Sequence, residues 1–159
     1  MIRLSIMQTK YSSHSRTIIV GLIISVDDKV LLGRKDTSSY YPDCWHLPGG
    51  GIKNDETPKQ ALLREILEET EIDLEEEGAA ISLVDDHGRA ERIKDRGGKK
   101  ILVKMKFIVF EVRLPKLANQ IKVQAGDDLA GLHWASLDRL REYQHTPPTV
   151  ELFERLGMG

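Results

Sequence analysis

The sequence contains a single cysteine, Cys44, so no intramolecular disulfide can form within it. This usage is typical of proteins in reducing compartments. Cys44 stands beside Trp45 and outside any cluster of Cys and His, so we do not expect a zinc site. We expect the thiol to be buried or a bystander.

Long apolar runs are also missing. No segment approaches the roughly 20 apolar residues that a membrane-spanning helix requires. The N-terminal stretch has neither a long apolar core nor a cleavage-like site, so we see no secretory signal in it. We therefore expect a cytoplasmic protein without a membrane partner.

An excess of positive charge is absent as well: 23 Lys and Arg stand against 25 Asp and Glu, a net charge of −2. This balance argues against broad nucleic-acid binding through a basic face. A small nucleotide or diphosphate substrate stays compatible, because a metal and a few basic residues can bind its phosphates. No repeat or linker divides the chain, so we expect one domain over residues 1–159, with residues 1–15 as an edge strand or a loose arm.

The strongest local signals lie in residues 50–72. Thr57 is a good N-cap, because its side-chain oxygen can accept from a free amide of the first helical turn. Pro58 suits the first helical position, and Thr57 with Gln60 makes a capping box. No Gly or Pro follows before Thr70, so the sequence predicts a helix that begins at Pro58.

Two groups of side chains recur at helical spacing on this predicted helix. The apolar group, which the spacing places on one side, consists of Leu62, Leu63, Ile66 and Leu67. The acidic group, which the spacing places together on another side, consists of Glu65, Glu68 and Glu69. These carboxylates repel one another, and a hard divalent cation such as Mg²⁺ would offset the repulsion. A solvated acidic helix face is the alternative.

The pattern around this helix resembles the signature of the Nudix hydrolases: Gly, five residues, Glu, seven residues, then Arg-Glu-apolar-any-Glu-Glu-any-Gly-apolar. The matching positions are Gly50, Glu56, Arg64, Glu65, Ile66, Glu68, Glu69 and Ile72. Many fixed positions agree, so chance is a poor explanation.

One position departs from that signature, because Glu71 stands where the family has glycine. A glycine just past a helix usually adopts a left-handed conformation, which costs a residue with a Cβ about 1 kcal/mol. Either Glu71 adopts this conformation, or the helix continues to a stop near Asp73 or Gly78. Glu71 lies beyond the acidic group, so we expect the departure to be tolerated.

The resemblance implies an α/β/α sandwich around a mixed β-sheet, whereas periodicity alone indicates only mixed helices and strands. We expect strands at residues 16–25, 30–34, 79–84, 101–114 and 129–134, and a short extended piece at 120–124. We expect two more helices, one at residues 137–143 capped by Ser136 and one that opens at Thr146 and ends at Gly157.

The resemblance also implies roles for individual residues. The implied metal ligands are the carbonyl of Gly49 and the carboxylates of Glu65, Glu68, Glu69 and Asp128. Mn²⁺ is an alternative to Mg²⁺. Arg64 would orient the carboxylates with Glu56 as its ion-pair partner. Asp127 is the alternative to Asp128 as ligand or general base, and an ordinary Asp turn is the alternative to both.

Candidate substrate contacts lie around the signature. Gly50 would let the backbone approach a ligand closely, and Arg34 resembles a phosphate contact at the end of a predicted strand. The alternative for Arg34 is that it only marks a solvent-facing strand end. The aromatic residues that could stack on a base or pack in the core are Tyr40, Tyr41 and Trp45.

A hairpin signalled by Gly97-Gly98 is rich in basic residues. Its cations are Arg89, Arg92, Lys94, Arg96, Lys99 and Lys100. The hairpin could reach over an anionic substrate or could simply be solvated. Strand edges of this kind could also pair two subunits, so a homodimer is open.

The activity that the resemblance implies is a Mg²⁺-dependent pyrophosphohydrolase that cleaves a nucleoside diphosphate linked to another moiety. A sanitiser of oxidised nucleoside triphosphates is the alternative enzyme. A nucleotide-sensing domain without catalysis is the alternative from another class, and Glu71 is the feature that favours it.

Overall fold

The computed structural model describes residues 12–35, 41–126 and 129–158. Its elements, in chain order, are β1 (Ser12–Ile24), β2 (Lys29–Lys35), β3 (Trp45–His46), β4 (Gly49–Gly51), α2 (Pro58–Thr70), β5 (Ala80–Asp85), β6 (Arg89–Arg96), β7 (Lys99–Arg113), the 3₁₀ helix η1 (Ala118–Gln120), β8 (Leu129–Ser136), the 3₁₀ helix η2 (Leu137–Glu142) and α3 (Pro147–Leu156).

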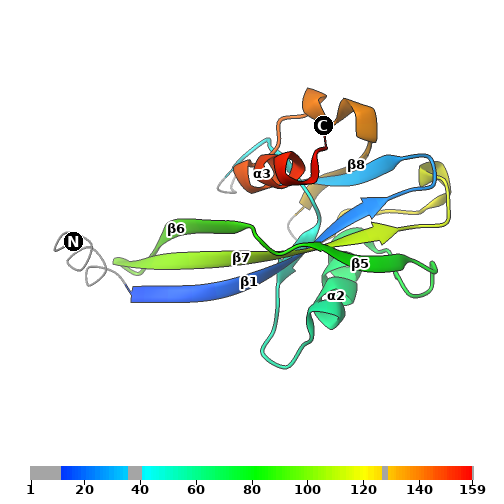
Figure 1. Ribbon diagram of the computed structural model, residues 1–159. Helices are drawn as coiled ribbons and strands as arrows, with labels where there is room; N and C mark the ends of the chain where they lie inside the picture. The colour runs from blue at the N-terminus through cyan, green and yellow to red at the C-terminus, as the bar shows by residue number, and fades with distance from the viewer. Residues whose placement is uncertain (1–11, 36–40, 127–128, 159) are drawn as a thin grey trace.

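The eight strands within the described ranges form one mixed sheet (Figure 1). Its central path is β3-β2-β1-β7-β5, with β4 paired to β1, β6 to β7 and β8 to β2. Strands β1 and β7 run parallel and the other pairs antiparallel. Helices α2 and α3 lie on opposite sides of this curled sheet, which confirms the expected α/β/α sandwich.

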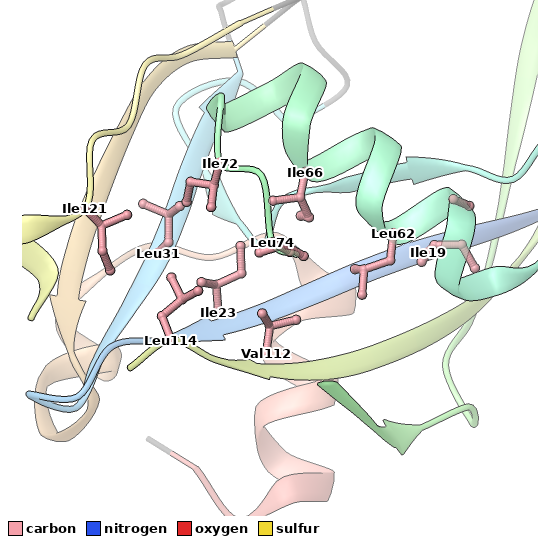
Figure 2. Packing of buried hydrophobic residues seen from close by; sticks show 11 residues of the cluster. Ile19, Ile23, Leu31, Leu62, Ile66, Ile72, Leu74, Val112, Leu114 and Ile121 are labelled. Atoms are coloured by element: carbon pink, nitrogen blue, oxygen red, sulfur yellow. The ribbon is translucent and has the colours of Figure 1, made fainter. Parts of the chain in front are cut away.

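Alternation along β1 divides the core between the two helices. Ile19 and Ile23 belong to the cluster under α2, where they pack with Leu62 and Ile66 (Figure 2). The next residues along the strand, such as Leu22, belong to the cluster under α3. Full burial of side chains of this size contributes about 1.5–3 kcal/mol each, so both helices are fixed to the sheet by apolar contact.

Helix α2 begins as the sequence predicts. The backbone amide of Gln60 donates to Thr57 Oγ1 at 3.2 Å, and the amide of Thr57 donates to Gln60 Oε1 at 2.9 Å, which completes the capping box. Leu67 was placed by its spacing on the same side of the helix as Leu62 and Ile66. The residue is 48% exposed, because it lies at the edge of the apolar stripe that Leu62 and Ile66 fill.

The end of α2 resolves the alternatives left open for Glu71. This residue has φ 64° and ψ 14°, the left-handed conformation, and its amide donates to the carbonyl of Leu67 at 3.0 Å. The helix therefore stops after Thr70 rather than continuing to Asp73. A glutamate occupies the turn at which a glycine would be unstrained.

Beyond the helices, β6 and the adjoining parts of β7 and β1 extend as a three-stranded ribbon with β7 in the middle (Figure 1). Gly97 and Gly98 form its predicted hairpin turn, with φ 59° and 84°. Residues 12–15, for which an edge strand and a loose arm were both open, are the beginning of β1. Residues 1–11 lie outside the described ranges.

Two local predictions differ from the structure. No strand forms at 120–124, where the amide of Gln124 instead donates to the carbonyl of Thr70 at the end of α2, at 3.0 Å. The helix after Ser136 is a 3₁₀ helix, and the Ser136 side chain makes no cap hydrogen bond to it.

The last helix agrees with expectation. It spans Pro147–Leu156 and ends at Gly157, which has φ 68°. Cys44 is buried with a free thiol, as expected. Among the described residues, no helix combines the length and apolar character that crossing a membrane requires.

Candidate active site

The acidic side of α2 meets the glycine strand β4. This strand pairs with β1, so that Gly49, Gly50 and Gly51 lie opposite Val20, Ile19 and Ile18. A Cβ on Gly49 would collide with the carbonyl oxygen of Ile19, and a Cβ on Gly50 would overlap the carboxylate of Glu65. The absence of side chains on β4 therefore allows the helix carboxylates to lie directly against a backbone strand.

Arg64 connects the groups at this junction. Its Nε lies 2.6 Å from Glu56 Oε2 and its Nη2 lies 2.8 Å from Glu56 Oε1. Its Nη1 lies 2.8 Å from Glu65 Oε1 and 3.3 Å from Glu68 Oε2, and its Nη2 donates to the carbonyl of Gly51 at 3.1 Å. The ion pair with Glu56 that the sequence predicted is thus present.

The charges of this network stabilise one another. The hydrogen bond from Arg64 lowers the pKa of Glu56 to about 2. The same bond and that to Glu65 raise the pKa of Arg64 above its ordinary value. Both groups are therefore charged at every pH at which the protein is expected to work.

Glu69 is the most enclosed of the three glutamates, with 4% of its surface exposed. Its Oε1 accepts from the amide of Gly49 at 2.6 Å. Glu65 also lies against β4, and Glu68 joins Glu65 through the shared Arg64 nitrogen. All three predicted carboxylates thus gather at one junction with Gly49 and Gly50.

The donor set at this junction suits a hard divalent cation, because such ions take carboxylate and carbonyl oxygens. In the part of the chain that the structure describes, however, no three or more His, Cys, Asp or Glu side chains are arranged to hold a metal as they stand. The carboxylates are held by Arg64 and the Gly49 amide instead. Asp127 and Asp128 lie outside the described residues.

A cavity of about 470 Å³ is lined by residues of the sheet, the glycine strand β4 among them, and by residues of α3 such as Thr149 and Leu152. Gly49, Gly50 and Gly51 line it, whereas Glu65, Glu68 and Glu69 do not, so the glycine strand separates the cavity from the carboxylates. Apolar side chains of β7 line one wall. The basic residues around the cavity are Arg16, Lys35, Arg89, Arg92 and Arg155.

Of the aromatic and basic residues predicted to contact substrate, some line the cavity and others do not. Tyr41 lines the cavity, and Tyr40 falls outside the described residues. Arg34 does not line it: its guanidinium lies over the Trp45 ring, with Cζ 5.5 Å from the centroid. Trp45 in turn packs against His133 and Tyr143 rather than facing the cavity.

Two residues that line the cavity, Arg16 and Arg155, were not predicted as site residues. Arg16 continues the alternation of Ile18 and Val20 on β1, a pattern that could have revealed it. Arg155 carries no such signal, because its position depends on Asp85, 70 residues away. Arg155 Nε and Nη2 donate to the two Asp85 oxygens at 3.0 and 2.9 Å. These bonds lower the pKa of Asp85.

Part of the chain is similar in sequence to proteins of known name. The chain is 39% identical over 57 residues to an 8-oxo-dGTP diphosphatase of Proteus vulgaris, covering 36% of this chain and 51% of the relative. It is 38% identical over 55 residues to a CTP pyrophosphohydrolase of Escherichia coli (strain K12), covering 35% of this chain and 41% of the relative. The matches thus span about half or less of these relatives' own lengths.

Similarity over the whole fold is broader. The crystal structure of a Nudix hydrolase from M. smegmatis, RenU, superposes with a TM-score of 0.66 over 92% of this chain and 86% of that chain. The identity is 19%, so this likeness concerns the fold alone. The family model described as the NUDIX domain matches residues 15–156. The chain belongs to the Nudix family.

Proposed function

We propose that the protein is a divalent-metal-dependent pyrophosphohydrolase that cleaves a nucleoside diphosphate linked to another moiety. The observation that carries this proposal is the junction of Glu65, Glu68 and Glu69 with the glycine strand β4, joined by Arg64. The family supports a phosphoanhydride-cleaving activity, and the two relatives above are named for such reactions.

We assign the metal site to the carbonyl of Gly49 and to the carboxylates of Glu65, Glu68 and Glu69. Mg²⁺ is the expected ion and Mn²⁺ the alternative. When bound, such an ion neutralises phosphate oxygens and makes a bound water more acidic. An acid at Asp127 or Asp128 would complete the set.

The chain's own groups perform the remaining tasks. Arg64 holds Glu65 and Glu68 in place, and it is itself held by Glu56 through two bonds. The bare backbone of Gly50 leaves room for the Glu65 carboxylate, which a Cβ at this position would overlap. One of the glutamates, or Asp127 or Asp128, would take the proton from the attacking water.

The cavity beyond β4 suits the nucleoside. Met105, Phe107 and Val109 supply an apolar wall, and Tyr41 supplies an aromatic face. A volume of about 470 Å³ lies within the range of ordinary small-molecule sites. The basic residues at its rim, such as Arg16 and Lys35, suit phosphate groups.

The alternative enzyme is a sanitiser of oxidised nucleoside triphosphates, which the name of the Proteus vulgaris relative favours. The alternative without catalysis is a nucleotide sensor, which Glu71 favours. The buried Glu69 argues against the sensor, since a nearly enclosed carboxylate is costly and a binding domain without a metal has less need of it.

The test is phosphate release from purified protein across a panel of substrates. The panel holds canonical and oxidised triphosphates, nucleoside diphosphates, diphosphate sugars, ADP-ribose and dinucleoside polyphosphates, each with Mg²⁺ and with a chelator. Glu69→Gln keeps an acceptor for the Gly49 amide but removes the charge. Glu75→Gln makes the same change at an exposed glutamate and is the control.

We expect metal-dependent turnover of one substrate group, reduced about 100-fold or more in Glu69→Gln and unchanged in Glu75→Gln. Full activity in Glu69→Gln would contradict the metal assignment. Tight nucleotide binding without any turnover would contradict the hydrolase proposal and support a nucleotide sensor instead.

A further inference from the structure

The two faces of the three-stranded ribbon carry different kinds of side chain. Residues directly opposite one another in neighbouring strands project to the same face. The register pairs Val103 of β7 with His14 of β1 and with Arg92 of β6. It pairs Ile101 with Lys94 of β6 in the same way. One face therefore has an apolar strip along β7, bordered by basic side chains from both outer strands.

A second cavity, of about 140 Å³, lies on this face. We call it the ribbon channel, and its lining consists of His14, Arg16, Lys94, Arg96, Ile101 and Val103. Arg16 lines both the ribbon channel and the larger cavity at β4. Its Nη2 lies 2.5 Å from the place that a Cβ on Gly51 would take. The ribbon channel therefore adjoins the cavity at β4, with Arg16 lining both.

Among the described residues, no carboxylate lines the ribbon channel, because the acidic residues of β6 lie on the other face. Glu91 lies opposite Lys104, and Asp95 lies opposite Lys100, in the alternate positions of the ribbon. Asp95 also accepts from the amide of Gly98 in the hairpin turn, at 3.1 Å. Although the net charge of the chain is −2, the charged side chains that line the ribbon channel are therefore all cationic.

These cations are not neutralised within the part of the chain that the structure describes. No carboxylate there forms an ion pair with Arg16, Lys94 or Arg96. Burial, followed by the nearby charges of Arg92, Arg16, Arg96 and Lys35, lowers the pKa of Lys94. Like charges held this close are unfavourable until an anion joins them.

We propose that the ribbon channel binds a further phosphate group of the substrate, beyond the diphosphate that is cleaved. The inference rests on the proposed function, because it takes the β4 junction as the place of hydrolysis. Extra phosphate suits the cationic walls, and the apolar floor of Ile101 and Val103 suits the sugar or base that carries it. The extra phosphate belongs either to a longer 5′-polyphosphate chain or to the linkage that joins a second nucleotide.

The experiment compares three substrates that share a 5′-triphosphate or a longer chain: ATP, adenosine 5′-tetraphosphate and the dinucleotide pppApA. The test variant is Lys94→Ser/Arg96→Ser, which removes two cations of the ribbon channel far from the glutamates. The matched control is Lys100→Ser/Lys104→Ser, which removes the same charge from the opposite face. Turnover gives kcat and KM for each, and calorimetric titration of the Glu69→Gln background gives binding without hydrolysis.

We expect adenosine 5′-tetraphosphate or pppApA to bind about tenfold or more tightly than ATP, through charge-assisted bonds to the channel cations. The advantage should disappear in Lys94→Ser/Arg96→Ser, persist in the control and leave turnover of ATP unchanged in both. An advantage for pppApA alone places the phosphate one nucleotide away, and one for the tetraphosphate places it in the linear chain.

The two proposals fail in different ways. If all three nucleotides bind equally, or if both double variants change binding by the same factor, the phosphate-binding role of the ribbon channel is wrong. The proposed hydrolysis is unaffected by that result. A channel-dependent advantage in the calorimetric titration, without turnover of any nucleotide, would overturn the hydrolase and leave the binding site standing.

Discussion

Arg64 and Glu56 form a two-bond ion pair, with Nε to Oε2 at 2.6 Å and Nη2 to Oε1 at 2.8 Å. Arg64 lies on α2, whereas Glu56 lies in the loop that precedes it. The same guanidinium also bonds Glu65 at 2.8 Å. A single planar group therefore fixes the position of the acidic side of α2 relative to the chain that leaves β4.

Arg64→Lys should disable this arrangement even though it keeps the charge. An ammonium is a point charge and cannot bond both Glu56 oxygens and Glu65 in one plane. We expect activity or metal affinity to fall about 10–100-fold, as for other groups that position metal ligands. The measurement is kcat and its dependence on Mg²⁺ concentration.

Arg113→Lys is the matched control, since Arg113 pairs with Glu111 at an exposed site away from β4. It should leave both quantities unchanged. If Arg64→Lys behaves like Arg113→Lys, the guanidinium does not position the carboxylates.

Gly50→Ala and Gly51→Ala should differ in effect although they are neighbours. A methyl on Gly50 overlaps the Glu65 carboxylate, whereas a methyl on Gly51 meets the flexible end of Arg16. Displacing a catalytic carboxylate by about 1 Å can cost about 100-fold in rate, so Gly50→Ala should lose most turnover. Gly51→Ala should retain it for nucleotides without an additional phosphate.

The readout is kcat in the two variants, with circular dichroism to establish that both are folded. Equal losses in the two variants would mean that β4 tolerates no side chain at all. The specific contact between Gly50 and Glu65 would then lose its support.

The start of α2 was predictable from the sequence because its determinants are local. Thr57, Pro58 and Gln60 act within one turn, and their capping box is present in the structure. The ion pair of Arg64 with Glu56 followed from the family signature. The roles assigned to the three glutamates stay predictions until they are tested.

Strand β4 and the ribbon channel were not predictable, for a different reason. Three glycines carry no apolar alternation, so only the pairing with β1 makes them a strand. The channel depends on the register of three strands, which brings Arg16 close to Lys94, a residue distant from it in the sequence. The hairpin of β6 and β7 was signalled by Gly97-Gly98, whereas the pairings of β4 and of β7 with β1 leave no local pattern.

Glu71→Gly should stabilise the protein. Glu71 has φ 64°, and glycine adopts this conformation without the steric cost of a Cβ. We expect the free energy of unfolding to rise by about 1 kcal/mol, with unchanged turnover. Urea unfolding measures the first quantity, and phosphate release measures the second.

Glu71→Ala separates the backbone effect from the charge, because alanine removes the carboxylate but keeps the Cβ. It should give little or none of the gain. A gain in Glu71→Ala equal to that in Glu71→Gly would instead attribute the instability to the charge of Glu71 near the end of α2.

The ion pair between Asp85 and Arg155 should make stability depend on pH. The Asp85 side chain is 4% exposed, and the Arg155 bonds lower its pKa below the ordinary value of 3.8. A lowered carboxyl pKa contributes stability that is complete above the unfolded-state pKa and is lost as the pH falls through the folded-state pKa. Asp85→Asn should therefore lower the free energy of unfolding by about 2 kcal/mol at pH 7.

That difference between the original protein and Asp85→Asn should shrink when urea unfolding is repeated at about pH 3, below the ordinary carboxyl pKa of 3.8. Asp86→Asn is the control, because Asp86 is 52% exposed and should give no difference of this size at either pH. A difference that stays constant from pH 7 to pH 3 would mean that Asp85 acts through packing. A difference that narrows would show that the contact between Asp85 of β5 and Arg155 of α3 stabilises the fold through the charge of the carboxylate.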